Sequence, residues 1–286
     1  MIIRKSISVQ IVLLMILPVV SPLYASNDST LLVFPRRDAS TTIKLFTPLA
    51  KYLSEKTGTN IKLRTVANYK TFMSALKTGD IGLVHLNQFQ YINAHRDYGY
   101  EVIAQNEEFG EKNIAGAIYV RRDSGISQLH QLKGKNIVFG GGHTAMMSYI
   151  VPTHLLRAAG LKAGDYQEKI SVSPPNAVIT MYLGHADAAG AGELVSQLPL
   201  VNKKINSEKL KIIARSPKLP HLVWAVSKNT SEKDKQVIKS ALINLKNTKK
   251  GTAILNSARL TGFNSAVDAD YDIHRNIIDS VLSVKH

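Results

Sequence analysis

Short apolar runs alternate along this chain with longer segments whose apolar residues recur at every third or fourth position. The run Leu31–Phe34 predicts a strand, and Thr42–Lys56 predicts a helix with one apolar face. A strand, a helix and a strand follow in the same manner at Ile61–Val66, Lys70–Lys77 and Ile81–His85. Since strands that alternate with helices build parallel sheets with crossover connections, the pattern predicts an α/β fold.

The second half of the chain repeats this plan. Its predicted strands and helices are Ile137–Phe139, Thr144–Ala159, Lys169–Val172, Asn176–Leu183 and Ala188–Ala191. The repeated order predicts two similarly built lobes. We assign residues 26–117 and 222–286 to lobe one and residues 118–221 to lobe two.

Two segments are expected to connect these lobes. Ala115–Arg122 predicts a strand that passes from lobe one to lobe two, and Ile212–Val226 predicts the return. Pro217 and Pro220 restrict the flexibility of the return to a few positions. Segments 234–246, 252–260 and 271–282 predict helices that pack back on lobe one.

The N-terminal residues 1–25 have the pattern of a signal peptide. Arg4 and Lys5 precede the apolar core Ile11–Val20, and Ala25 supplies a small residue for cleavage. The alternative is a membrane anchor, but the core is shorter than the ~20 residues that span a bilayer. We therefore expect export with cleavage near Ala25. No cysteine follows the core, which excludes lipoprotein anchoring.

The composition of the chain restricts its partners. Its formal net charge is +15, which in an exported protein favours anionic ligands or acidic surfaces over nucleic acid. The lysines are scattered, so the alternative is that the charge only keeps the protein soluble. The chain contains no cysteine, which excludes disulfides, thiol nucleophiles and thiolate metal sites.

A run of three glycines carries the clearest candidate chemistry. Gly140–Gly142 join a predicted strand to a predicted helix, and His143 and Thr144 follow them directly. This order exposes backbone N–H groups at the positive end of a helix dipole, where anions bind. His143 and Thr144 are candidates to donate hydrogen bonds to a ligand. The alternative for Thr144 is that it only caps the helix.

Other candidate ligand residues follow the carboxyl ends of predicted strands, where open α/β sheets bind their ligands. Tyr69 is expected to stack on a ligand or to donate from its hydroxyl group, and Asn176 to donate and accept. The alternatives are a partly buried aromatic side chain for Tyr69 and a helix N-cap for Asn176. Tyr91 and Gln88 are further candidates.

Three charged residues in the same loops are also candidates. Arg36 and its neighbour Arg37 suit an anion, although an exposed charged pair is the alternative. Glu193 is expected to bind an amine or another hydrogen-bond donor of the ligand. Its alternative role is to begin a helix, where its charge suits the dipole.

Patterns of catalytic and metal-binding residues are absent from the sequence. There is no HExxH or GxSxG motif, GGGHT lacks the lysine of a phosphate-binding P-loop, and the nine histidines show no metal-ligand spacing. No catalytic residue, metal or cofactor is therefore predicted. An exported hydrolase is the alternative that these absences disfavour.

Several segments together resemble a known family. These are VFPRRDAS, VANYKTFMSALKTGDIGLVHLNQFQYINA, LKGKNIVFGGGHT and the tail GTAILNSARLTGFNSAVDADYDIHRNI. The chain resembles the periplasmic phosphate/phosphite/phosphonate-binding proteins of ABC importers, which have the type II periplasmic binding protein fold. The resemblance implies two lobes with mostly parallel sheets and a two-stranded hinge. By position, Tyr69, Tyr91, His143, Thr144 and Asn176 fall where that family binds its ligand.

The resemblance also implies a function and partners. We expect a monomeric periplasmic protein that captures a small oxyanion between its lobes and delivers it to an ABC permease. The segment GGHTAMMS has fewer hydroxyl groups than the family usually carries there. This difference motivates an alternative, a ligand-sensing module of the same fold that signals to a membrane sensor kinase or cyclase.

Overall fold

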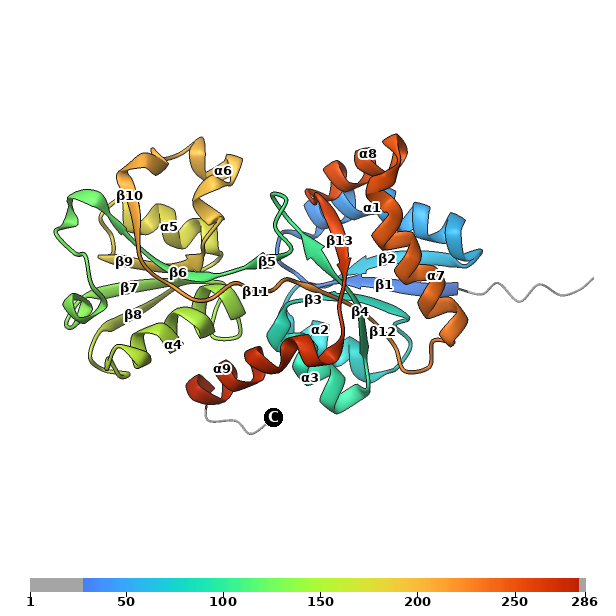
Figure 1. Ribbon diagram of the computed structural model, residues 1–286, viewed down its shortest axis with the longest axis horizontal. Coiled ribbons are helices and arrows are strands. Elements are labelled where there is room, and N and C mark those ends of the chain that lie inside the picture. The colour runs from blue at the N-terminus through green and yellow to red at the C-terminus, as the bar shows by residue number, and fades with distance from the viewer. Residues whose placement is uncertain (1–27, 283–286) are drawn as a thin grey trace, which may run out of the picture.

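Two separate sheets, each with helices against both of its faces, form two lobes (Figure 1). The computed structural model describes residues 28–282, so the predicted signal peptide lies outside the described residues. The two-lobed α/β fold expected from the sequence is confirmed. Among the described residues, no helix has both the length and the apolar character needed to cross a bilayer.

The lobe-one sheet contains six strands. Strands β1 to β4 run in one direction, while β12 and β13 run in the other. Val33 at the end of β1 lies beside Thr65 of β2 and His85 of β3, so these strands end together. Their spatial order is β13 (Gly262–Ser265), β4 (Glu101–Glu107), β12 (Val223–Val226), β3 (Leu83–Leu86), β1 (Asp28–Val33) and β2 (Asn60–Thr65).

Six helices cover the lobe-one sheet. One face packs against α1 (Ala39–Thr57), α7 (Glu232–Ile243) and α8 (Lys249–Ala258), and the other against α2 (Tyr69–Lys77), α3 (Gln88–Tyr98) and α9 (Asp272–Leu282). Local signals set the bounds of α1: Asp38 accepts from the N–H of Thr41 at its start, and left-handed Gly58 ends it.

The lobe-two sheet has five strands, of which β6 alone runs against the others. Their spatial order is β10 (Leu210–Arg215), β6 (Gly116–Arg121), β9 (Ala188–Gly192), β7 (Asn136–Gly140) and β8 (Gln167–Ser171). Helices α5 (Pro174–Tyr182) and α6 (Pro199–Asn202) cover one face, and α4 (Val151–Ala158) covers the other.

The helix expected at Thr144–Ala159 begins later and differently. It opens with a π-helical turn, Met146–Ile150, and only then becomes α4. Pro152 explains the wide turn, because proline has no N–H to donate and its ring clashes with the carbonyl group four residues earlier. The expected position of Thr144 as helix cap is therefore wrong: Ala145 holds that place and makes no side-chain cap.

The lobes are linked in two ways. Short strands β5 (Asn113–Ile114) and β11 (Leu219–Pro220) pair antiparallel where the chain crosses between the sheets. Helix α9 packs on both α3 and α4, and Arg157 of α4 donates to the carbonyl oxygen of Ser280 at 2.6 Å. The expectation that all C-terminal helices pack on lobe one thus holds for α7 and α8, while α9 bridges the lobes.

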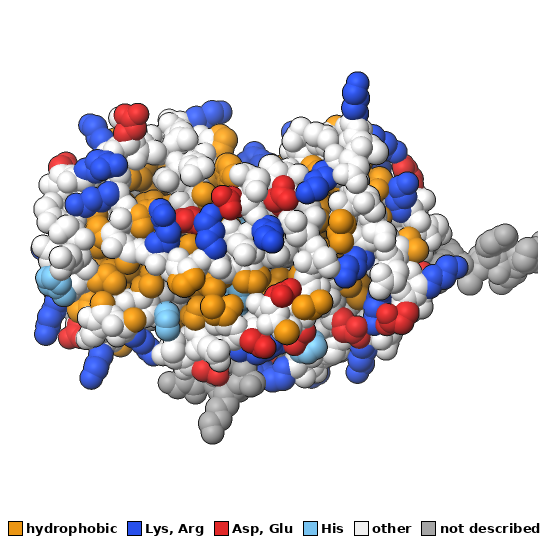
Figure 2. Space-filling view, viewed as in Figure 1, with side chains coloured by type: hydrophobic (Ala, Val, Ile, Leu, Met, Phe, Trp, Pro, Cys, Tyr) orange, Lys and Arg blue, Asp and Glu red, His pale blue; other side chains and the backbone are white. Residues whose placement is uncertain are grey.

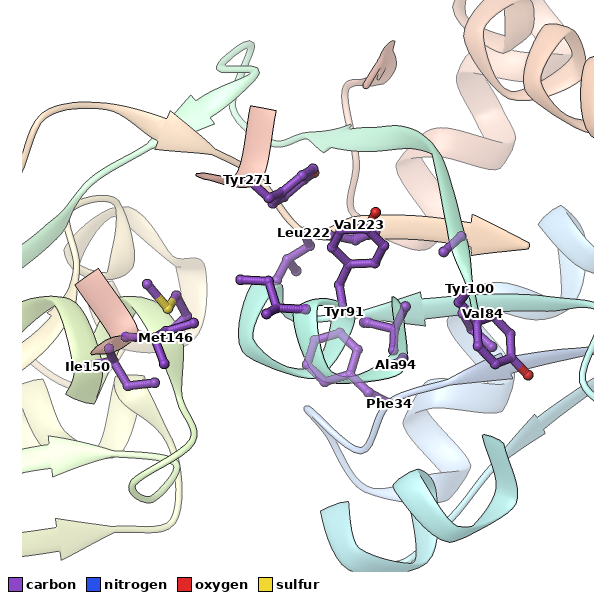
Figure 3. Packing of buried hydrophobic residues seen from close by; sticks show 14 of the residues in the cluster. Phe34, Val84, Tyr91, Ala94, Tyr100, Met146, Ile150, Leu222, Val223 and Tyr271 are labelled. Carbon is purple, nitrogen blue, oxygen red and sulfur yellow. The ribbon is translucent and has the colours of Figure 1, made fainter. Parts of the chain in front are cut away.

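An apolar cluster fills the junction beside this bridge. Met146 and Ile150 of lobe two belong to the same buried cluster as Tyr91 and Leu222 of lobe one (Figure 3). The chain therefore makes an apolar contact with lobe one directly after the glycine run 140–142.

Candidate functional site

The carboxyl ends of strands from the two lobes meet between the two sheets. Asn87, directly after β3, donates from Nδ2 to the carbonyl oxygen of Thr144, which follows β7, at 3.1 Å. The surface is notched between the lobes, with Lys and Arg side chains on both sides of the notch (Figure 2). We call this edge the interlobe site; it comprises loops 34–38, 66–69 and 108–111 and residue Asn87 of lobe one, and residues 141–145, 171–176 and 193 of lobe two.

Arg36, a predicted ligand residue, is neutralised inside lobe one. Its Nη1 atom lies 2.9 Å from Oε1 of Glu108, and Asn106 donates to the same oxygen at 3.2 Å. Burial alone would raise the pKa of Glu108, but the charges of Arg36 and His221, the hydrogen bond from Arg36 and the Arg37 charge lower it to about 2. The charge of Arg36 is thus matched by a carboxylate that stays ionised.

Arg37 differs from its neighbour. Its side chain is half-buried, and no carboxylate among residues 28–282 lies within ion-pair distance of it. Burial, followed by repulsion from Arg36, lowers the pKa of Arg37 to about 10, so it remains charged at neutral pH. The sequence shows two adjacent arginines, but it cannot show which one Glu108 neutralises. Both arginines were therefore candidates from the sequence, and the structure distinguishes them.

Tyr69 lies close to these arginines. It is the first residue of α2, after the N-cap Asn68, and its ring stacks on Phe34 with centroids 6.4 Å apart. Burial raises the pKa of Tyr69, while the charge of nearby Arg36 opposes that rise. The structure thus brings two predicted ligand residues, Tyr69 and Arg36, together at the ends of neighbouring strands.

The glycine run contributes backbone donors on the lobe-two side. Gly141 and Gly142 both have a φ of +85°, which L side chains rarely adopt, and the N–H of Gly141 bonds to Ser171. In the described chain, the N–H groups of the next residues, Gly142 to Thr144, donate to no protein acceptor. Consecutive N–H groups in such a turn form a concave site that suits an anion.

His143 is turned toward lobe two itself. Its Nε2 atom lies 2.7 Å from Oε1 of Glu168, and Tyr149 donates to the other oxygen of that carboxylate at 3.0 Å. The ring of His143 also packs edge-on against Tyr149, at 4.6 Å between centroids. This arrangement fixes the glycine loop through its side chain, and ligand binding by His143 stays a prediction.

Two other predicted residues of lobe two have different surroundings. Asn176 is exposed in the first turn of α5; Ser173 is the N-cap of that helix, so the cap alternative for Asn176 is wrong. Glu193 is buried and lies 3.1 Å from Nε of Arg215, and it also accepts from the N–H of Ala115 at 3.1 Å. The carboxylate expected to bind an amine of the ligand already has protein partners.

Tyr91 and Gln88 lie inside lobe one rather than at its edge. Tyr91 is 0% exposed, and its hydroxyl group donates to Asp268 at 2.6 Å. Gln88 is buried as well and donates from Nε2 to the carbonyl oxygen of Pro220 at 2.9 Å. The structure does not bring these two candidates to the interlobe site, and their role as ligand residues stays a prediction.

A conservative variant separates the two roles of Tyr91. Tyr91→Phe is expected to lower the free energy of unfolding by about 1.5–3 kcal/mol, because it removes a hydrogen bond to the ionised Asp268. Ligand affinity is expected to stay unchanged, since the hydroxyl group bonds to Asp268, which lies outside the interlobe site. Urea denaturation and a binding titration of the same variant measure both. A loss of affinity at unchanged stability would restore Tyr91 as a ligand residue.

The chain has two α/β lobes, a pair of antiparallel strands where it crosses between them, and polar and charged residues at the strand ends that face each other. These features define the type II periplasmic binding protein class. The chain belongs to the family described as "ABC transporter, phosphonate, periplasmic substrate-binding protein", which matches residues 31–271.

Solved structures share this fold. A Prochlorococcus marinus PhnD1 in complex with methylphosphonate is 19% identical, with a TM-score of 0.78 over 91% of this chain and 100% of that chain. A binding protein component of a Pseudomonas aeruginosa ABC phosphonate transporter is 15% identical, with a TM-score of 0.74 over 88% of this chain and 85% of that one. A histidine kinase sensor domain is 17% identical, with a TM-score of 0.53 over 82% and 97% of the two chains.

Proposed function

We propose that this protein captures a small oxyanion of the phosphonate, phosphite or phosphate class between its lobes and delivers it to an ABC permease. The carrying observation is Arg37, a half-buried guanidinium without an ion-pair partner among the described residues, beside an Arg36 that Glu108 neutralises. An unmatched buried charge is costly unless an opposite charge joins it. A bound oxyanion supplies that charge.

The two lobes contribute different groups to the proposed site. Lobe one offers Arg37, Arg36 and Tyr69, and lobe two offers the free N–H groups of the glycine run with Thr144 and Asn176 nearby. A ligand that touches both lobes favours the state in which they are close. In this proposal the protein acts as a periplasmic monomer after signal-peptide cleavage and catalyses no reaction.

A ligand screen tests the proposal. Phosphate, phosphite, methylphosphonate, sulfate and small organic acids are each added to the purified exported protein, and its melting temperature is recorded. A ligand at 100 times its dissociation constant is expected to stabilise the protein by ~2.7 kcal/mol. If no oxyanion raises the melting temperature, the proposal fails.

Variants connect a positive result to the site. Tyr69→Ala and Thr144→Ala are each expected to weaken the best ligand. Tyr182→Ala, at the far end of α5 and also partly exposed, is the matched control and is expected to leave affinity unchanged. Unchanged affinity in both site variants would mean that the ligand binds elsewhere.

Sensing is the second candidate function, and two observations support it. A histidine kinase sensor domain has the same fold, and the glycine loop here is fixed by His143 and Glu168 rather than lined with hydroxyl groups. Deleting the gene and measuring uptake of the best ligand separates the functions. Loss of uptake supports delivery to a permease, while unchanged uptake with an altered ligand response supports sensing.

A further inference from the structure

The carboxylates around the interlobe site all have partners already. Asp38 caps α1, and Glu111 lies 2.9 Å from Nζ of Lys218. Glu107 at the end of β4 accepts from Asn264 at 3.1 Å and lies 3.5 Å from Lys246. Glu168 accepts from Tyr149 at 3.0 Å and lies 2.7 Å from Nε2 of His143. The acidic residues that belong to the interlobe site, flank it or contact its loops in the described chain are Asp38, Glu107, Glu108, Glu111, Glu168 and Glu193.

Glu193 is the most strongly held of these groups on the lobe-two side. Its side chain is only 6% exposed, and Arg215 and Lys218 lie 3.1 Å and 3.5 Å from its two oxygens. The N–H of Ala115 occupies Oε1 as well. A cationic ligand group would have to displace two protein cations to reach this carboxylate, so we expect Glu193 not to serve as an ammonium site.

Glu108 is unavailable for the same reason. It is buried, Arg36 and Asn106 both bond to Oε1, and Nε2 of His221 lies 4.0 Å from Oε2. The surplus charge at this edge of lobe one is therefore positive, and it comes from Arg37 and from Arg259, whose charge acts on Arg37. A ligand that carries its own cation would meet Arg37 and would find every carboxylate there already bonded to protein groups, so such a cation disfavours binding.

We propose that Arg37 binds the oxyanion directly and that the ligand carries no ammonium or other cationic group. Phosphite, phosphate and alkylphosphonates meet this condition, whereas aminoalkylphosphonates do not. This inference rests on the proposed function and narrows the class of ligand. The unmatched positive charge at the interlobe site favours an anion and disfavours a ligand that carries a cation.

Isosteric ligand pairs test the exclusion of a cation. Ethylphosphonate and aminomethylphosphonate have the same heavy-atom skeleton and differ by a methyl group against an ammonium group. Isothermal titration at pH 7.5 is expected to give at least tenfold tighter binding of ethylphosphonate. A ratio near one, or a preference for aminomethylphosphonate, overturns the inference while leaving the proposed function intact. If no oxyanion of any kind binds, the proposed function itself fails.

A double variant tests why a ligand with a cationic group is expected to bind more weakly. Arg215→Gln combined with Lys218→Gln releases Glu193 from its two cations and is expected to narrow the ratio between the two ligands. An unchanged ratio would overturn the assignment of the exclusion to this paired carboxylate.

Variants of Arg37 test its contact with the ligand. Arg37→Gln is expected to weaken phosphite at least tenfold, and Arg37→Lys to restore part of the affinity because it keeps the charge. The melting temperature without ligand is expected not to fall, since Arg37→Gln removes a charge that pairs with no carboxylate in the described chain. Arg64→Gln, an exposed arginine on β2, is the matched control. Full affinity of Arg37→Gln for phosphite would overturn the assignment.

Discussion

Between pH 7 and pH 5 the free energy of unfolding is expected to fall by about 4 kcal/mol, because two histidines are held neutral inside lobe one. His85 is 2% exposed and stacks on Trp224 at 4.5 Å, with Nδ1 donating to the carbonyl oxygen of Val223 at 3.0 Å. His274 is 0% exposed, and neither ring nitrogen makes a hydrogen bond of good geometry with the described residues. Burial lowers the pKa of each imidazole to about 3.

The direction of this effect follows from which state binds more protons. In the unfolded chain both histidines titrate near pH 6.5, while in the folded protein they stay neutral down to about pH 3. Stability is therefore complete above pH 6.5 and falls as the pH is lowered toward 3. Each pH unit below 6.5 removes ~1.4 kcal/mol per histidine.

Other groups that face these histidines change how steeply the free energy of unfolding falls with pH, but they do not reverse the direction. Arg36 and Arg275 disfavour protonation of His85 and His274 respectively, and the Pro220 carbonyl group favours it slightly at His274. His221 adds to the same trend, because burial lowers its pKa to about 4 although Glu108 opposes this shift.

Urea denaturation at several pH values measures the prediction. The slope of the unfolding free energy against pH reports how many more protons the unfolded state binds than the folded state. His274→Gln is expected to reduce this number by one, whatever the effect of the substitution on stability at pH 7. His185→Gln changes an exposed histidine and is expected to leave the slope unchanged. A wild-type slope of less than one proton between pH 6 and pH 5 would contradict the burial of neutral imidazoles.

The architecture of this protein could be read from local patterns because each element carries its own signals. Helix α1 shows this clearly: an apolar stripe places Phe46, Leu49 and Leu53 in the core, Asp38 caps its start and Gly58 ends it. The repeated order of strands and helices predicted that the chain folds into two similarly built lobes. The bridging position of α9 was not predicted, because its apolar face does not reveal which lobe it covers.

The chemistry of the site was predicted less well, since it depends on partners far away in sequence. Glu108 decides that Arg36 is neutralised, and the two residues are 72 positions apart. Tyr91 follows a strand end like Tyr69, yet it points into the core because its face of α3 packs toward Asp268 and Tyr271. Position after a strand therefore identifies the site, while side-chain direction and charge pairing require the tertiary structure.

The glycine run shows how one local pattern serves two purposes. Gly141 and Gly142 adopt positive φ values that release backbone N–H groups, whereas Gly140 has an ordinary φ and is required for space. A Cβ atom at Gly140 would lie 2.3 Å from both the N and Cα atoms of Pro174. The end of β7 and the start of α5 can be this close only because residue 140 has no side chain.

Gly140→Ala is accordingly expected to destabilise the protein by about 3 kcal/mol or more, at the upper end of the range for overpacking, because the clash is with backbone atoms that cannot rotate away. Ligand affinity is expected to fall as well, since β7 and α5 carry the glycine loop and Asn176. Gly142→Ala is the matched control: its Cβ meets no atom within 4 Å, so only the strain of φ +85° remains, about 1–2 kcal/mol. Urea denaturation of both variants, with a titration of the best oxyanion, makes the comparison. Equal losses of stability would show that conformational freedom, rather than the close approach to Pro174, is what Gly140 provides.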